Sequence, residues 1–145
     1  MAESKASGFW KKSIENRIVS QQASQKQHYN AAASRYYYAL YQAAFAFLEV
    51  KKIPVPDKIL RQKRWVKNKN PDTWPHRELS ENIDGLFIGS GFQRIMKNAW
   101  DLRIKGDYKD TPVEPDEYAL ITGKADRLFE VIRNEIDKDE TKRAD

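Results

Sequence analysis

Two side chains in the sequence have the chemistry needed to act on a phosphate ester: Arg103 and His76. The planar guanidinium of an arginine forms paired hydrogen bonds with phosphate oxygens. A histidine exchanges a proton near neutral pH. The sequence therefore offers one candidate phosphate contact and one candidate proton carrier.

Arg103 also has a purely structural interpretation. The apolar stripe formed by Phe92, Met96 and Ala99 continues directly onto it, so its side chain is expected to point toward packed residues. Asp107 lies four residues later, where a helix would allow an ion pair with Arg103. An inward arginine at a crevice and an intrahelical ion pair are both compatible with this spacing.

The two histidines, His76 and His28, do not suggest a metal site. His76 stands beside Pro75 at the start of a helical pattern, where it can be a general base or a packed or capping residue. His28 lies in a polar helix end. Because the chain has no cysteine and no histidine or carboxylate motif at ligand spacing, we expect neither a metal nor another cofactor.

A basic segment with an aromatic residue covers positions 51–69, in which eight lysines and arginines accompany one acid, Asp57. Such a segment can hold a nucleic-acid backbone and stack a base. It can equally be a solubilising loop whose tryptophan packs against the rest of the domain. The candidate nucleic-acid-binding residues are Arg35, Lys58, Arg61, Lys63, Arg64 and Trp65.

The elements that must position these residues are helices, because apolar residues recur at helical spacing through most of the chain. The pattern predicts an all-α protein, an up-and-down bundle of four to five helices. We expect the helices at about 9–26, 30–51, 76–87 and 92–102, with a last helix of over 20 residues beginning at Pro115 and reaching Ile136.

Four local details accompany this prediction. Tyr37, Tyr41, Ala44 and Leu48 form the stripe of the second helix that should face the core. Trp10, Ile14 and Ile18 share one face of the first helix and should face the core. A break is expected near residues 28–30, with Asn30 as the N-cap of the second helix. One short helix is expected after Asp57.

Length and charge suit a single domain that favours polyanionic partners. The 145 residues carry a net charge of +5, enough to attract a polyanion. We expect one domain over 1–145, with a core at about 9–137, a basic proline-containing insertion at about 51–75 and a solvated tail at 138–145. No stretch looks like a signal peptide or reaches the roughly 20 apolar residues of a membrane helix, so we expect a soluble, cytoplasmic protein.

The stretch YNAAASRYYYALYQAAFAFLE, residues 29–49, resembles the second helix of HEPN domains, an all-α family associated with nucleotides and RNA. Two later segments are similar to the family's motifs in the same order: PHREL, which contains His76, and LRIKGDY, which contains Arg103. The resemblance extends over about residues 9–136. The matching positions are Ser34, Arg35, Tyr37, Tyr38, Ala39, Tyr41, Ala43, His76, Arg103, Gly106, Asp107 and Tyr108.

The resemblance implies a helical bundle that is usually a homodimer and is often encoded beside a minimal nucleotidyltransferase in toxin–antitoxin or defence systems. Nuclease members cut RNA without a metal, using an arginine followed after four to six residues by a histidine. Here the residue after that spacing is Tyr108, and no histidine follows Arg103. The resemblance therefore implies Arg103, Tyr108 and His76 as the catalytic candidates, although a tyrosine, with an ordinary pKa of about 10, is a weak base at neutral pH. The leading hypothesis is a protein that binds RNA or a nucleotide, with Ser34, Tyr37, Tyr38 and Asp107 as structural signature. The alternative is a non-catalytic helical adaptor or dimerisation module.

Overall fold

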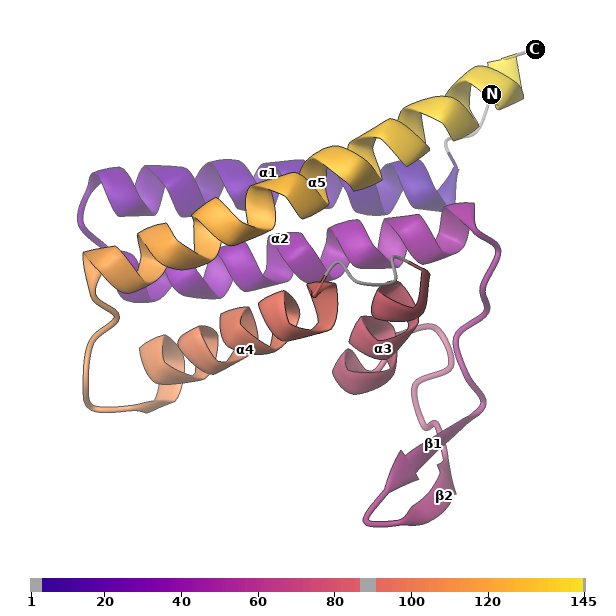
Figure 1. Ribbon diagram of the computed structural model, residues 1–145, viewed down its shortest axis with the longest axis horizontal. Coiled ribbons are helices and arrows are strands. Elements are labelled where there is room, and N and C mark those ends of the chain that lie inside the picture. The colour runs from indigo at the N-terminus through magenta and orange to yellow at the C-terminus, as the bar shows by residue number, and fades with distance from the viewer. Residues whose placement is uncertain (1–3, 87–90, 145) are drawn as a thin grey trace.

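The computed structural model describes residues 4–86 and 91–144, which form a bundle of helices with one projecting β-hairpin (Figure 1). The predicted all-α bundle is thereby confirmed, apart from this small two-stranded sheet. The elements are α1 (Lys5–Gln25), α2 (Tyr29–Val50), β1 (Lys58–Arg61), β2 (Arg64–Lys67), α3 (His76–Leu86), α4 (Phe92–Tyr108) and α5 (Pro115–Ala144).

Helix α2 is the centre of the bundle and packs against α1, α3, α4 and α5. The stripe expected to face the core, Tyr37, Tyr41, Ala44 and Leu48, is buried, and burial continues around the other sides of the helix. Six alanines of α2 are also buried, and their small side chains let neighbouring helices approach closely on several sides. The buried alanines are Ala32, Ala33, Ala39, Ala43, Ala44 and Ala46.

The expected core face of α1 was wrong for two of its three residues, since Trp10 is partly buried and packs against the core. Ile14 and Ile18 are 42% and 49% exposed, and the buried side of the helix includes Ser13 and Ser20 instead. The Ser13 hydroxyl donates to the Ala39 carbonyl at 2.7 Å, and the Ser20 hydroxyl donates to the Ala32 carbonyl at 2.6 Å. Small side chains with satisfied hydroxyls therefore bring α1 against α2, which apolar spacing does not reveal.

The predicted break between the first two helices is confirmed, but its cap is not Asn30. The cap position of α2 is His28, whose side chain makes no cap hydrogen bond. The side-chain oxygen of Asn30 instead accepts from the Val113 backbone N–H at 2.8 Å. A Cβ on Gly106 would stand 3.0 Å from the Asn30 carbonyl oxygen, so glycine there allows α4 to pass the start of α2.

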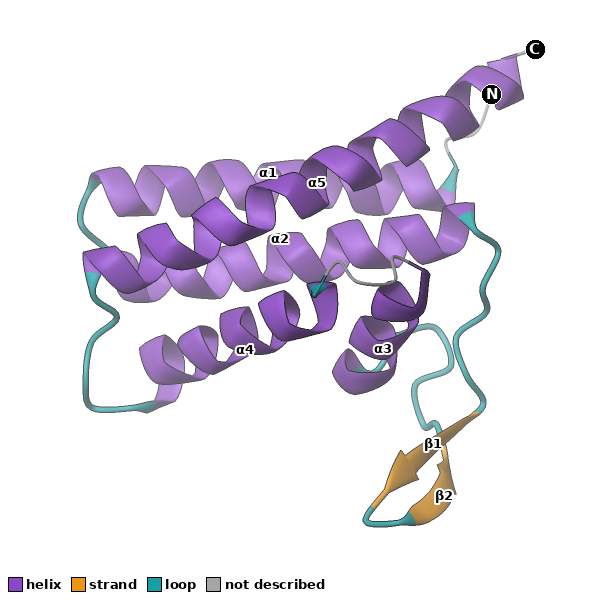
Figure 2. Cartoon of the chain, viewed as in Figure 1, coloured by secondary structure: helices purple, strands orange, loops and turns teal. Residues whose placement is uncertain are grey.

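The short helix expected after Asp57 was also wrong, because this segment is an antiparallel hairpin (Figure 2). Lys58 pairs with Lys67 and Arg61 with Arg64, which leaves a two-residue turn. Both turn residues have positive φ angles, as tight hairpin turns require. The strands are four residues long and lack a glycine-containing turn, so the sequence carries little hairpin signal.

The remaining helices follow the predicted apolar stripes. Helix α5 begins at Pro115 and buries Ile121, Ala125, Leu128, Ile132 and Ile136, while α4 buries Phe92, Met96, Ala99 and Leu102. Helix α5 continues through the solvated tail to Ala144, and position 87 of the expected third helix lies outside the described residues. Within the described ranges, no helix combines the length and apolar character needed to cross a membrane.

Candidate functional site

His76 is the first residue of α3, and it lies among aromatic side chains from α2 and α4. The Tyr37 hydroxyl hydrogen-bonds with His76 Nδ1. The ring centroids of Tyr41 and Trp100 lie 4.8 and 4.7 Å from that of His76. Part of the imidazole is exposed to solvent, so His76 is anchored on its Nδ1 side and remains open to a ligand.

Arg103 of α4 is enclosed by aromatic rings. Its Cζ lies 4.8 Å from the Trp100 centroid, 5.0 Å from Tyr38, and 5.9 Å from both Tyr37 and Tyr108, and its side chain is 11% exposed. Cations are stabilised over aromatic faces at such distances. The four rings therefore hold the guanidinium in a fixed place.

Asp107 completes the environment of Arg103. Its Oδ2 lies 3.4 Å from Arg103 Nε and accepts from the Ser34 hydroxyl at 3.1 Å. The Arg103–Asp107 contact is an ion pair without the alignment of a hydrogen bond, since Arg103 Nε has no hydrogen-bond partner among the described residues. The predicted intrahelical pair is present, and it links α4 to Ser34 of α2.

The structure brings His76 and Arg103 together, because both pack against Trp100 and Tyr37. Desolvation of the buried part of the His76 ring, and then the positive charge of Arg103, lower the pKa of His76 below its usual value. His76 is therefore neutral at pH 7 and can accept a proton or donate one N–H hydrogen bond to a ligand.

Nearby tyrosines are held as neutral phenols. Burial raises the pKa of Tyr37 far above its ordinary value and that of Tyr41 to about 12. The Tyr41 hydroxyl donates to the Trp74 carbonyl at 2.6 Å. Tyr108 is 70% exposed at the end of α4, with its ring beside Arg103. Tyr37 and Tyr41 therefore hold their neighbours in place, and His76 is a better proton carrier than either of them at neutral pH.

Two surface hollows meet at His76. We call them the α3–α4 hollow, of about 570 Å³, and the hairpin hollow, of about 580 Å³. Both volumes fall within the roughly 300–1,000 Å³ typical of small-molecule sites. The α3–α4 hollow is lined by residues that include Tyr37, Arg77, Glu81, Gln93, Lys97, Trp100 and Asp101, and the hairpin hollow by residues that include Ile59, Lys67, Lys69, Thr73 and Trp74.

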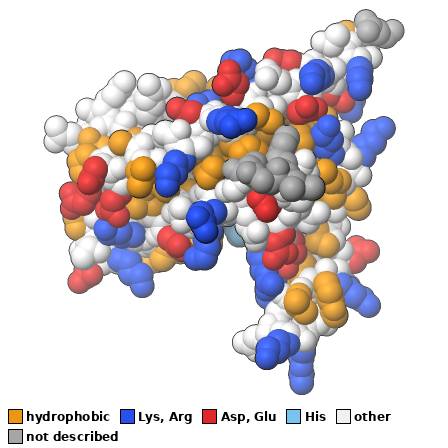
Figure 3. Space-filling model, in the orientation of Figure 1, with side chains coloured by type: hydrophobic (Ala, Val, Ile, Leu, Met, Phe, Trp, Pro, Cys, Tyr) orange, Lys and Arg blue, Asp and Glu red, His pale blue; other side chains and the backbone are white. Residues whose placement is uncertain are grey.

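The hairpin presents its basic residues and its tryptophan to solvent. Trp65 is 71% exposed, so the interpretation in which it packs against the bundle was wrong. Lys58, Lys63 and Arg64 are also exposed, and basic side chains surround the projecting arm in the space-filling view (Figure 3). These residues form a mixed cationic and aromatic surface next to the hairpin hollow.

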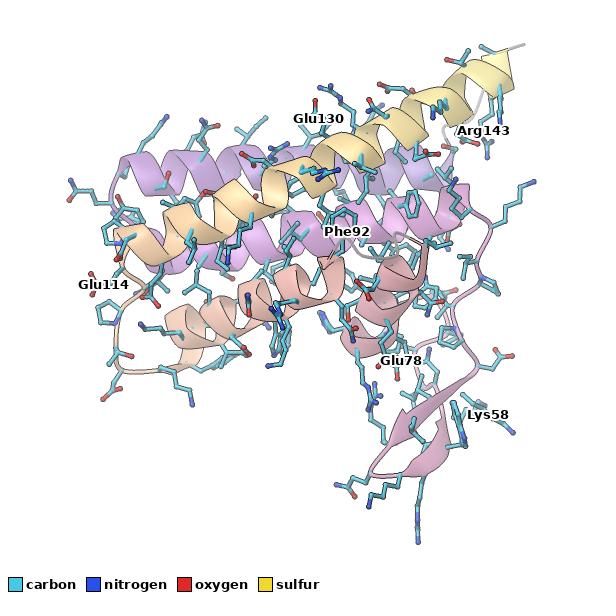
Figure 4. All side chains as sticks on the ribbon, viewed as in Figure 1. Lys58, Glu78, Phe92, Glu114, Glu130 and Arg143 are labelled. Carbon is cyan, nitrogen blue, oxygen red and sulfur yellow. The ribbon has the colours of Figure 1, made fainter. Side chains whose placement is uncertain are left out.

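Two of the predicted cations have different surroundings. Arg61 donates to both carboxylate oxygens of Glu78, at 2.6 and 3.2 Å. Glu78 lies on the side of α3 that faces the hairpin (Figure 4), so this pair fixes the hairpin relative to His76, two residues earlier. Arg35 is exposed on α2 and borders neither hollow.

Sequence reasoning did not single out Trp74 and Trp100, the tryptophans that border the hairpin hollow and the α3–α4 hollow. The spacing of Trp100, three residues before Arg103, is a signal that they share a helix face. Among the described side chains, no three histidine, aspartate or glutamate residues are grouped as a metal site would require.

The lowered pKa of His76 predicts an acid-sensitive fold. Below about pH 6.5 an unfolded chain binds the His76 proton more readily than the folded protein. The free energy of unfolding should therefore fall as the pH is lowered from 7 through the pKa of folded His76. Urea unfolding between pH 7 and 5 measures this slope. His76→Gln should flatten it, whereas His28→Gln, at an exposed position, should leave it unchanged; an equal slope in all three proteins would contradict the prediction.

No protein-family model matches this chain, and neither do any curated proteins or solved structures. The chemistry of the site is therefore interpreted from its own side chains.

Proposed function

We propose that the protein binds nucleotides, either within single-stranded RNA or free, in the groove formed by the two hollows on either side of His76. The observation that carries the proposal is the position of His76, which borders a hollow containing lysines and a hollow containing Trp100. Nucleotides need both features, because they combine an anionic phosphate with a flat aromatic base.

The hairpin supports binding to a longer strand. Exposed Lys58, Lys63 and Arg64 can neutralise successive phosphates, and exposed Trp65 offers a ring on which an unpaired base can stack. No glutamate or aspartate lies within the hairpin itself, residues 58–67. A single strand lying along the hairpin would therefore enter the groove at the hairpin hollow.

The resemblance to HEPN domains supports the same ligand class and extends the proposal to a toxin-like or defence role beside a minimal nucleotidyltransferase. It rests on the three motif-like segments in residues 29–49, 75–79 and 102–108. The identity of the adjacent gene tests this extension: a small nucleotidyltransferase would support the paired system, and a gene without such a relationship would count against it.

The proposed function predicts salt-dependent RNA binding that requires the hairpin. Replacing both Lys63 and Arg64 with glutamine should reduce the salt dependence of the association constant by about 1.4 logarithmic units per tenfold change in salt, since each phosphate contact on a single strand contributes about 0.7. Trp65→Ala should weaken binding by about 1–3 kcal/mol through lost stacking. Fluorescence anisotropy of a labelled 12-nucleotide single-stranded RNA measures both effects.

A charge-matched control comes from α5. Lys124→Gln combined with Arg127→Gln removes two exposed cations there, and should leave the salt slope close to that of the unaltered protein. If the salt dependence of the association constant fell equally in the hairpin and α5 variants, the effect would come from the overall charge of the protein and not from the hairpin. An absence of binding to RNA and to mononucleotides by the unaltered protein would overturn the proposed function.

A second function, an adaptor or dimerisation module, is favoured by apolar side chains exposed on α1 and α5. Ile14, Ile18 and Val19 are 42%, 49% and 41% exposed, and Leu120 of α5 is 59% exposed. We propose the α1 side chains as a surface for a second copy of the chain or for a protein partner such as a nucleotidyltransferase; Leu120 borders a separate hollow between α4 and α5. Light scattering after size exclusion tests self-association: a dimer that Ile18→Lys converts to a monomer would support it, and a monomer at high concentration would contradict it.

A further inference from the structure

We propose that the two hollows divide one nucleotide between them: the hairpin hollow takes the phosphate and the α3–α4 hollow takes the base, so that the ribose lies at His76. This inference rests on the proposed function and adds an orientation and a role for each hollow.

The charge of the hairpin hollow suits a phosphate. Among the residues that line it, Lys67 and Lys69 are cationic and none is acidic. Neither lysine has a carboxylate partner in the described ion pairs. Asn68 is committed to the fold, because its side-chain amide donates to the Pro56 carbonyl at 2.9 Å and its side-chain oxygen accepts from the Asn70 backbone N–H at 3.1 Å. The lysines are therefore the groups available to bind an anion.

Trp74 gives independent support for an acceptor in the hairpin hollow. Its side chain is 1% exposed and borders this hollow. Its indole Nε1–H has no hydrogen-bond acceptor within the described part of the chain. A buried donor without a partner costs about 1–3 kcal/mol. Because this nitrogen is enclosed, the wall of the hollow would have to shift before a ligand oxygen could reach it and recover that energy.

The α3–α4 hollow has the opposite character. Its two cations already have partners on the same helix: Arg77 Nε lies 2.9 Å from Glu81 and Lys97 Nζ lies 3.2 Å from Asp101. The positive charges of Arg77 and Lys97 are thus already neutralised by carboxylates. A phosphate placed here would lie beside those carboxylates and would be repelled by them. An uncharged aromatic base fits better, with Trp100 for stacking and the carboxylates as acceptors for exocyclic amino groups.

The position of His76 follows from covalent connectivity. The ribose joins the base to the phosphate, and His76 is the residue that the two hollows share. With Nδ1 engaged by the Tyr37 hydroxyl, Nε2 is the remaining ring nitrogen for a sugar hydroxyl. A ribose hydroxyl can donate to or accept from this nitrogen, whichever tautomer is present.

The indole N–H signals of Trp74 and Trp100 in a ¹⁵N-labelled full-length protein report on the two hollows separately. Ribose 5-phosphate is expected to shift the Trp74 signal and leave Trp100 in place, and adenosine to do the reverse. Adenosine 5′-monophosphate should shift both and bind at least tenfold more tightly than either fragment. Comparing its Kd with that of the 12-nucleotide RNA distinguishes a free nucleotide from an RNA strand as the ligand.

Substitutions test the same division by calorimetry. Lys67→Gln with Lys69→Gln should weaken ribose 5-phosphate and the monophosphate by at least tenfold, because even one charge-assisted hydrogen bond contributes about 1.5–3 kcal/mol and tenfold corresponds to about 1.4 kcal/mol. The same pair of substitutions should leave adenosine within twofold. Trp100→Leu should weaken adenosine more than ribose 5-phosphate, which loses only the support that Trp100 gives to His76. Trp100 also packs against Arg103, so its substitution can disturb the fold. The indole signals of the unaltered protein avoid this problem, because they report on the same hollow without a substitution.

The division of the nucleotide can fail while nucleotide binding itself holds. This would be the result if Lys67→Gln with Lys69→Gln weakened the affinity for adenosine, or if ribose 5-phosphate shifted the indole signal of Trp100 instead of that of Trp74. RNA binding that moves neither indole would overturn it in the same way. Failure of the unaltered protein to bind RNA or the monophosphate would overturn both. The Lys124→Gln, Arg127→Gln protein controls for charge.

Discussion

Arg103→Ala is expected to lower the free energy of unfolding by about 3 kcal/mol. The substitution removes a guanidinium that is 11% exposed and stacked among four aromatic rings, and it leaves Asp107 without its cationic partner. Asp107 is exposed, so the ion pair itself contributes about 1 kcal/mol or less. The desolvated guanidinium over the aromatic rings contributes about 2 kcal/mol more. Urea unfolding followed by circular dichroism measures the change.

Arg103→Lys is the matched control, because it keeps the charge and loses the planar group that stacks on the rings. Its stability should fall between those of the unaltered protein and Arg103→Ala. The charge of Arg103 lowers the pKa of His76, so this pKa should rise toward its ordinary value in Arg103→Ala and change less in Arg103→Lys. Histidine ring proton signals followed by pH titration provide the readout. Unchanged stability in both variants would contradict a packed Arg103.

If the protein cleaves RNA without a metal, Arg103→Ala could abolish cleavage for either of two reasons. Arg103 borders neither hollow, and its guanidinium faces the rings that also hold His76. A loss of metal-independent cleavage in this variant would thus report a displaced His76 as readily as a lost phosphate contact. His76→Gln removes the proton carrier and keeps the cation. Cleavage that survives His76→Gln but not Arg103→Ala would assign a phosphate contact to Arg103.

The three consecutive tyrosines of α2 show what the sequence did and did not reveal. Successive residues on a helix point about 100° apart, so Tyr36, Tyr37 and Tyr38 face different neighbours. Tyr36 packs edge-on against Phe129 of α5 at 5.6 Å, Tyr37 contacts His76, and the Tyr38 ring lies beside Arg103. The sequence predicts that the tyrosine rings of this helix line two interfaces, but it does not identify the partners.

The site itself could be predicted only in part. Arg103 and Asp107 are one helical turn apart, so local geometry was sufficient to predict their pairing. His76 and Arg103 lie on different helices, and their proximity depends on how α3 and α4 both pack on α2. The hairpin was missed because all four residues of β2 are exposed and its turn contains Gln62 and Lys63 in place of glycine.

Apolar periodicity predicted the wrong buried face for α1. Substitutions at the adjacent residues Ser13 and Ile14 test whether α1 packs on α2 through its serines. Ser13→Leu should lower the free energy of unfolding by about 3 kcal/mol: extra methylenes in a close-packed contact cost about 1–3 kcal/mol, and the Ala39 carbonyl loses its 2.7 Å hydrogen bond. Ile14→Ser changes a side chain that is 42% exposed, so it should cost under about 1.5 kcal/mol.

The contrast between the two variants is stronger evidence than either value alone. Hydrophobicity favours Ser13→Leu and disfavours Ile14→Ser, whereas packing predicts the reverse order. Ser13→Ala separates the two contributions, because it removes the hydroxyl without adding volume and should cost about 1 kcal/mol. Urea unfolding of the four proteins at one pH decides between them. If Ile14→Ser were the most destabilised, α1 would pack on α2 through its isoleucines, and the apolar side chains exposed on α1 would no longer be available as a surface for a partner.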